Sequence, residues 1–222
     1  YAVDLDALRG SIFSEKVVPM TQIVVSSING HNPSLKPWPY DPAKARALLA
    51  EAKADGVKVD TEILMRGRLN MYPNATEAME AIHAMLSDVG FNVKLTMVEV
   101  SQWVESYTRP YAEDRGPVLQ QGQHDNNSGD AVFSVYYKYG CEGPQSTTCD
   151  EQVEAGIKAA SAATGDERRK LWQEVMRRLH EDIVPDVQMF HMVGFSRVNS
   201  RLDFTPSIST NSELQIAQIK FK

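Results

Sequence analysis

Apolar and polar residues recur along the chain with two periods, and these periods predict its secondary structure. Over residues 42–55, apolar positions have helical spacing: Ala45, Leu48, Leu49 and Ala52. This spacing predicts a helix with one buried face. Asp41 can cap its first turn, and Gly56 suits the left-handed position that follows a helix.

The next segments alternate between strand and helix patterns. Residues 57–64 and 91–100 alternate apolar and polar side chains, which predicts two half-buried strands. Between them, residues 75–89 have a helical apolar stripe, and Asn74 and Glu77 have the spacing of a capping box. Helix, strand, helix and strand with short links favour a layered α/β domain with a right-handed crossover.

The second half of the chain predicts further elements of the same kinds. Residues 1–13 and 150–163 predict helices, and another helix begins at Thr164. Residues 118–122 suit a strand, which leads through a polar loop to a helix beginning at Ala131.

Composition and motifs exclude several classes of function. The net charge of −6 over 222 residues argues against a nucleic-acid surface. No apolar run approaches the roughly 18 residues that a membrane span requires. The chain lacks the serine elbow, the zinc-protease motif and the phosphate-binding loop. We therefore expect a binding protein without a cofactor or metal, not an enzyme.

Three stretches carry a resemblance to a known family. Residues 40–52, residues 81–95 and the Glu99-to-Trp103 segment are similar to the extracytoplasmic solute-binding proteins of ABC transporters, family 5. Members have two lobes with the ligand held between them, and the resemblance covers only their C-terminal part. It implies a periplasmic binding protein-like (type II) C-terminal lobe, an α/β fold with a mixed sheet flanked by helices. Residues 1–197 are expected to form this lobe, and 198–222 to return to a missing N-terminal lobe.

The first candidate site residues follow the strand predicted at 57–64. Arg66, Arg68 and Tyr72 lie there, and ligands gather outside the carboxyl ends of strands in open α/β sheets. An arginine at that position can bind a carboxylate through two hydrogen bonds. The alternative is that both arginines are solvated loop charges. Trp103, after the second strand, is either a core residue or an apolar wall for the ligand.

The polar loop at 124–130 supplies the other candidates. The family carries a Gly-Asp pair that lines the cleft, and the resemblance implies that Asp130 binds the ammonium group of a peptide-like ligand. The alternative is that Asp130 caps the helix that begins at Ala131. His124 and Asn126 are further candidate contacts in the same loop. A metal site built on His124 is disfavoured, because zinc ligands usually come in tighter sequence pairs.

Cys141 and Cys149 bracket a loop of turn-forming residues. This spacing suits a disulfide that pins the loop, a bond that persists only in an oxidising compartment such as the periplasm. Two free surface thiols are the alternative.

The whole sequence is interpreted as the C-terminal lobe of a periplasmic receptor. It would capture a peptide-like solute by closure of two lobes and deliver it to ABC permease subunits, as a monomer. One alternative is the same transport role for an opine, an oligosaccharide or a metal chelate. Another is an interaction or sensor module that kept the fold without transport.

Overall fold

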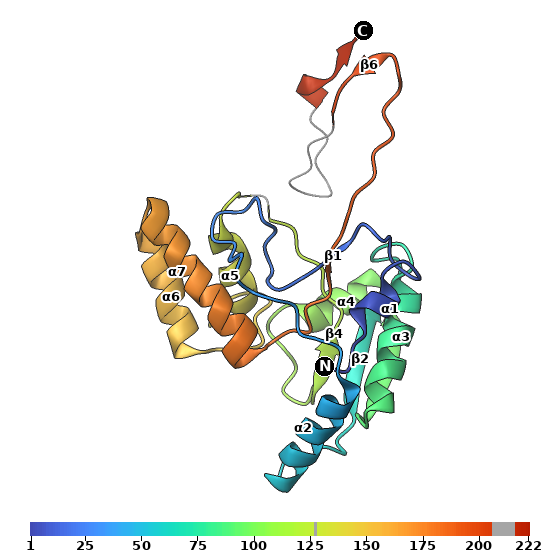
Figure 1. Cartoon of the computed structure of the whole chain (residues 1–222). Coiled ribbons are helices and arrows are strands. Elements are labelled where there is room, and N and C mark those ends of the chain that lie inside the picture. Colours follow the sequence, from blue (N-terminus) through green and yellow to red (C-terminus); the bar gives the residue numbers. More distant parts are fainter. Residues whose placement is uncertain (127, 206–215) are drawn as a thin grey trace. The chain divides into compact units, whose positions relative to one another are not determined.

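The computed structural model describes residues 1–126, 128–205 and 216–222, and it divides the chain into two compact units (Figure 1). Unit 1 comprises Tyr1–Thr21, Lys36–Gln123 and Pro144–Ser146. Unit 2 comprises Gln22–Leu35, His124–Gly143 and Thr147–Lys222. The chain passes from one unit to the other several times, so neither is continuous in sequence. The boundary at 197/198 between lobe and tail stays a prediction.

Unit 1 is an α/β unit, as the sequence predicts. Its elements in chain order are α1 (Leu5–Leu8), β1 (Val18–Pro19), α2 (Pro42–Ala54), β2 (Ile63–Arg68), α3 (Ala75–Asp88), β3 (Val93–Val98), α4 (Val100–Tyr107) and β4 (Val118–Gln120). In Figure 1, α3 runs alongside β2, and both elements are in contact with each other.

The sheet of unit 1 has β2 in the middle and the order β3-β2-β4, with parallel pairing on both sides. Met65 is buried on one face of β2. On the same face, a Cβ added to Gly67 would lie 2.4 Å from the Sδ atom of Met97 and 3.0 Å from Cγ of Met79. A side chain at position 67 would therefore force the Met97 side chain to move, at the place where α3 packs onto the sheet.

Unit 2 is mainly helical. Its elements are α5 (Ala131–Tyr139), α6 (Glu151–Ala162), α7 (Gly165–Arg178), a π-helical turn (Leu179–Ile183), β5 (Phe190–His191), β6 (Leu202–Asp203), a 3₁₀ turn (Ile216–Gln218) and β7 (Lys220–Phe221). Strands β6 and β7 pair antiparallel, so parallel and antiparallel pairings occur in separate sheets. None of the helices formed by the described residues is long and apolar enough to cross a membrane.

The core of unit 2 forms where α5, α6 and α7 meet. Helices α6 and α7 lie side by side and α5 contacts α6 (Figure 1). Trp172 is completely buried in this core, together with Val135 and Ile157. Gly30 has a φ of +100°, and a Cβ there would lie 2.5 Å from Cβ of Trp172. The loop can pass this close to α7 only because residue 30 is glycine.

A bidentate ion pair ties the ends of these three helices together. Asp130 caps α5 by accepting a hydrogen bond from the Val132 N–H. Arg168, in the first turns of α7, donates Nε and Nη2 to the two Asp130 oxygens at 2.8 and 2.7 Å. Its Nη1 also donates to the Ala160 carbonyl at the end of α6, at 2.6 Å. Asn29 Nδ2 gives Asp130 a fourth hydrogen bond, at 2.8 Å.

The chain confirms some of the predicted helix signals. The Asp41 carboxylate accepts the Lys44 N–H at 2.9 Å and caps α2. Gly56 and Gly90 have φ values of +88° and +107°, the left-handed conformation expected after α2 and α3.

Other local predictions were wrong. Asn74 is the N-cap residue of α3, but its backbone is left-handed and its side chain accepts no capping hydrogen bond, while its Nδ2 donates to the Ile12 carbonyl. The helix predicted at 1–13 is only one turn, Leu5–Leu8. The first strand begins at Ile63, because Val57 and Thr61 use their N–H groups in local turns.

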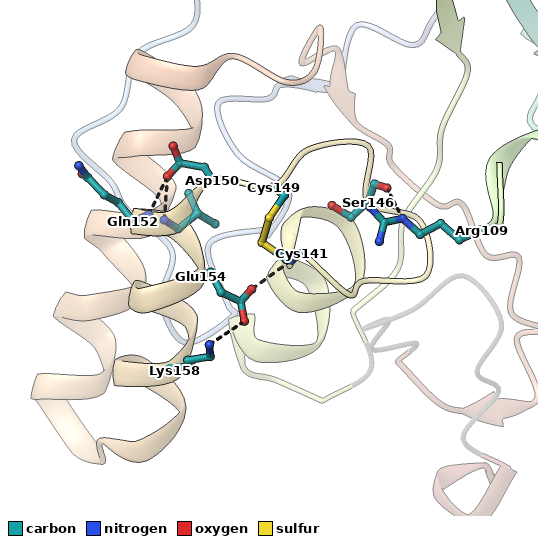
Figure 2. The surroundings of a disulfide bond; sticks show 9 residues. Arg109, Cys141, Ser146, Cys149, Asp150, Gln152, Glu154 and Lys158 are labelled. Carbon is teal, nitrogen blue, oxygen red and sulfur yellow. Dashed lines mark hydrogen bonds and ion pairs between the residues drawn. A yellow bond between two sulfur atoms is a disulfide. The ribbon is translucent and has the colours of Figure 1, made fainter. Parts of the chain in front are cut away.

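The two cysteines form the predicted disulfide, Cys141–Cys149 (Figure 2). The N–H of Cys141 donates to Oε2 of Glu154 on α6 at 3.0 Å. Asp150, next to Cys149, caps α6 by accepting the Gln152 and Val153 N–H groups. The disulfide therefore fastens the end of α5 to the start of α6.

Replacing Arg168 should destabilise unit 2. We expect Arg168→Ala to lower the free energy of unfolding by about 2–3 kcal/mol, because it leaves the half-buried Asp130 carboxylate without its guanidinium partner. Urea denaturation followed by circular dichroism measures this change. Arg177→Ala is the matched control, since the carboxylates that pair with Arg177 among the described residues are exposed and lie on its own helix and the following turn. Equal losses in the two variants would contradict the role given to Arg168.

The contribution of Asp130 should disappear in acid. Burial opposes its ionisation, but the hydrogen bonds from Arg168, Asn29 and Val132 outweigh burial and lower the Asp130 pKa from 3.8 to about 2. A depressed pKa stabilises the folded state above the unfolded value and loses that effect as pH falls through the folded value. The unfolding free-energy gap between the wild type and Asp130→Asn should therefore be constant above about pH 4 and shrink towards pH 2. A gap that does not change with pH would rule this out.

Removing the disulfide should cost stability without changing the fold. In the chain-entropy account, a loop of this length stabilises by about 2–3 kcal/mol. We expect Cys141→Ala/Cys149→Ala to lose that amount in urea denaturation. Dithiothreitol should lower the stability of the wild type to the same value and leave the double variant unaffected. An undiminished stability after reduction would show that the bond constrains nothing.

Candidate functional site

The candidate site of unit 1 lies at the carboxyl ends of β2 and β4. The connection from β2 to β3 leads away from β4, because β4 pairs with the opposite side of β2. Such a reversal of strand order leaves a crevice at the carboxyl ends of the strands, where open α/β sheets bind ligands. Arg66 and Arg68 end β2, and Gln120 ends β4 in register with Arg66.

Gln121 joins four of the predicted site residues. Its Oε1 accepts the Arg68 N–H at 2.8 Å, and its Nε2 donates to the Tyr72 hydroxyl at 2.8 Å. Its carbonyl accepts the Trp103 indole N–H at 2.9 Å, while its own N–H donates to the Arg66 carbonyl. Gln121 is 7% exposed. Every polar group of this residue is therefore used to fix the site.

Trp103 has the first of the two roles that the sequence left open, that of a core residue, and its role as a wall for the ligand stays a prediction. It is buried against Met71 and Ala75, so it is a core residue of unit 1. The Arg68 guanidinium lies 5.4 Å from the centre of its ring, within the range of a cation–π contact. Trp103 therefore also forms a fixed aromatic surface beside Arg68.

Tyr72 presents a hydroxyl group to the site. Burial raises the Tyr72 pKa, and the hydrogen bond from Gln121 partly offsets this effect. Because the oxygen accepts from Gln121, the hydroxyl proton is available to another acceptor.

Arg66 and Arg68 form no ion pair within the described ranges, whereas Arg46, Arg168 and Arg178 are paired with carboxylates. Nε of Arg66 and Nε2 of Gln120 are buried and have no hydrogen-bond partner in the part of the chain that the structure describes. Together with the Tyr72 hydroxyl, the available groups at this site are donors. A site of this kind can bind an acceptor-rich group, above all a carboxylate.

The candidate residues of unit 2 are organised differently. Both oxygens of Asp130 already accept two hydrogen bonds each, from Arg168, Asn29 and the Val132 N–H. A carboxylate has about four such acceptor positions. Asp130 is thus a helix cap and half of an ion pair, and its part in ligand binding stays a prediction.

Asn126 and His124 meet at Ser134 on α5. Asn126 Nδ2 donates to the Ser134 hydroxyl and to the Asp130 carbonyl, both at 2.8 Å. His124 Nε2 lies 2.9 Å from the same hydroxyl. Burial, followed by the charge of Lys138, lowers the His124 pKa to about 4. His124 is therefore neutral at physiological pH, and its ring stacks on Phe133 at 5.3 Å between centroids.

The structure thus gathers Arg68, Tyr72 and Trp103 in unit 1, and His124, Asn126 and Asp130 in unit 2. Asn127, inside the predicted loop, lies outside the described residues. Among those that are described, no three His, Cys, Asp or Glu side chains form a group that could hold a metal ion.

Sequence reasoning missed Gln120, Gln121, Ser134 and Arg168. The two glutamines had a usable signal, because they end a predicted strand in the same way as the arginines of β2. The sequence carried no such signal for Ser134 and Arg168, because each acts through a hydrogen bond to a residue that is distant in sequence or in another element.

Comparisons with known proteins agree with this fold. A sequence model of the bacterial extracellular solute-binding proteins, family 5 Middle, matches residues 1–145. The di/tripeptide-binding protein 4 of Pseudomonas aeruginosa is 30% identical over 158 residues, covering 68% of this chain and 28% of the relative. The dipeptide-binding protein of Escherichia coli K12 is 26% identical over 209 residues, covering 91% of this chain and 38% of the relative. The chain therefore spans about a third of the length of these curated relatives.

Among solved structures, the fold is similar to that of the dipeptide-binding protein of Pseudoalteromonas sp. SM9913 in complex with Met-Leu. The TM-score is 0.76 at 16% identity, covering 100% of this chain and 43% of the other. The family match extends over more than half of the chain, from its first residue to the disulfide loop. This chain belongs to the bacterial extracellular solute-binding proteins of family 5.

Proposed function

We propose that the chain is the C-terminal part of an extracytoplasmic solute-binding protein that captures peptide-like solutes for an ABC importer. The observation that carries this proposal is the pair of arginines at the end of β2, which have no carboxylate partner among the described residues. Two sequence relatives are named as a di/tripeptide-binding protein and a dipeptide-binding protein, and these names support the choice of ligand.

Arg68 is the side chain best prepared to bind the carboxylate of such a ligand. Its backbone is held by Gln121, and its guanidinium lies over Trp103. A guanidinium that is oriented in advance loses less entropy when it forms two parallel bonds with a carboxylate. The Tyr72 hydroxyl adds a further donor, and the indole of Trp103 covers the apolar part of the ligand.

The ammonium group of the ligand remains assigned to unit 2 as a proposal. Binding to Asp130 would require the ammonium to replace a hydrogen bond from Arg168 or Asn29. His124 and Asn126 would contact the ligand from the same loop. Because Asp130 is paired within the chain, we expect the ammonium contact to contribute less affinity than the carboxylate contact.

Capture would depend on closure of this lobe against an N-terminal lobe, to which the tail at 198–222 is expected to return. Closure excludes water and strengthens the polar contacts. A monomer in the periplasm would then present the ligand to the permease subunits. The disulfide supports such an oxidising location. The proposal is binding without catalysis.

The same donors suit other solutes with a carboxylate, such as an opine. They suit an oligosaccharide or a metal chelate less well, because these need acceptors or metal ligands at the site. An interaction module without transport would bind none of these solutes.

Calorimetric titration of the full-length protein with Ala-Ala tests the proposal. Arg68→Ala should weaken binding by about ten- to a hundredfold, the value of one charge-assisted pair. Amidation of the peptide carboxyl group should weaken binding to the wild type by a similar factor and have little further effect on Arg68→Ala. Arg46→Ala, which breaks an exposed ion pair with Asp88, is the matched control.

The same titration is repeated with opines, amines and sugars, and three outcomes would count against the proposal. If amidated and free peptides bind equally, the arginines do not recognise a carboxylate. If opines bind and peptides do not, the transport role stands with another ligand. If peptides, amines, opines and sugars all fail to bind, the interaction module becomes the better account.

A further inference from the structure

The two arginines of β2 occupy the same face of the sheet. Arg66 and Arg68 are two residues apart, and side chains two apart on a strand point to the same side, about 7 Å from each other. The intervening Gly67 faces α3 on the opposite side. The candidate site therefore holds two positive charges in a row.

Each arginine has its own neighbours. Arg68 lies over Trp103 and is joined to Tyr72 through Gln121, as described above. Arg66 is in register with Gln120 across the β2–β4 pairing, so these two side chains emerge next to each other. The structure thus separates the donors of the site into two sets.

The side chains of Arg66 and Gln120 place two donors in a buried position without hydrogen-bond partners among the described residues. The Ser106 hydroxyl lies 3.2 Å from Gln120 Oε1 and 3.0 Å from the Trp103 carbonyl, so its single proton is shared between these acceptors. Gln120 Nε2 and Arg66 Nε are both buried without a partner in the described part of the chain. Buried donors without partners are rare, because each one costs the free energy of its lost hydration.

One carboxylate cannot serve both sets. Its two oxygens match the fork of a single guanidinium, and a carboxylate bound to Arg68 leaves the Arg66 charge and two buried donors uncompensated. A second anionic group, placed about one residue away on the ligand, would complete the site. Within a peptide, that group is the side-chain carboxylate of an acidic residue.

We propose that Arg66 and Gln120 form a subsite for a second carboxylate, so that the protein prefers peptides with an acidic side chain close to the C-terminal carboxylate. This inference rests on the proposed function, in which Arg68 binds the C-terminal carboxylate. It adds a specificity subsite made by Arg66 and Gln120, with the Ser106 hydroxyl next to the Gln120 amide.

Paired titrations of the full-length protein with Ala-Glu and Ala-Gln test the subsite, since these dipeptides differ only by a carboxylate and an amide. The wild type should bind Ala-Glu at least about tenfold more tightly, the value of one charge-assisted pair. Arg66→Met should abolish this preference, so that the ratio of the Ala-Glu and Ala-Gln affinities falls to about one. Gln120→Met should reduce the preference several-fold. Thermal unfolding of each variant establishes that it is folded.

The possible results separate this inference from the function beneath it. Equal binding of Ala-Glu and Ala-Gln by the wild type would overturn the subsite and leave peptide capture intact. A parallel loss of both affinities in Arg66→Met would also overturn it, because Arg66 would then hold the shared C-terminal carboxylate. Failure to bind either dipeptide, or Ala-Ala, would instead overturn the proposed function.

Discussion

The parallel pairing of β2 with β3 on one side and β4 on the other fixes which side chains meet at the candidate site. With both edges paired, the strand cannot shift in register without losing two ladders of hydrogen bonds. Its alternation then sends Met65 and Gly67 under α3 and both arginines to the other face. Gln121 depends on the same pairing, because its N–H continues the ladder to the Arg66 carbonyl. The site is therefore a consequence of strand order.

The two units differ in whether their key charged side chains are paired. In unit 2, Asp130 and Arg168 satisfy each other and hold three helix ends together. Such a pair is already neutralised, so a ligand gains little by joining it. In unit 1, Arg66 and Arg68 carry full charges that no described carboxylate offsets. Among the described residues, uncompensated positive charge is therefore found at the end of β2.

Sequence patterns predicted the elements of the fold well where local signals decide the outcome. Asp41, Gly56 and the alternation around residues 93–98 act through neighbours in the chain, and the structure agrees with them. Asn74 shows the limit of such signals. Its capping-box spacing is correct, but its left-handed backbone goes with a side chain that forms no cap, and its Nδ2 donates to a carbonyl 62 residues away in sequence. Local spacing cannot report a partner that the tertiary fold supplies.

The same limit explains the outcome for the site residues. Strand-end position alone pointed to Arg66 and Arg68, because parallel topology places such residues at a ligand crevice. For Asp130, the sequence allowed a cap or a ligand contact, and only the position of Arg168, 38 residues later, reveals that its oxygens are occupied. The net charge of the whole chain, −6, likewise does not indicate the sign of the charge at the candidate site. Charges farther away than about 8 Å are screened at physiological salt, so a local pair of unpaired arginines attracts an anion even on an acidic chain.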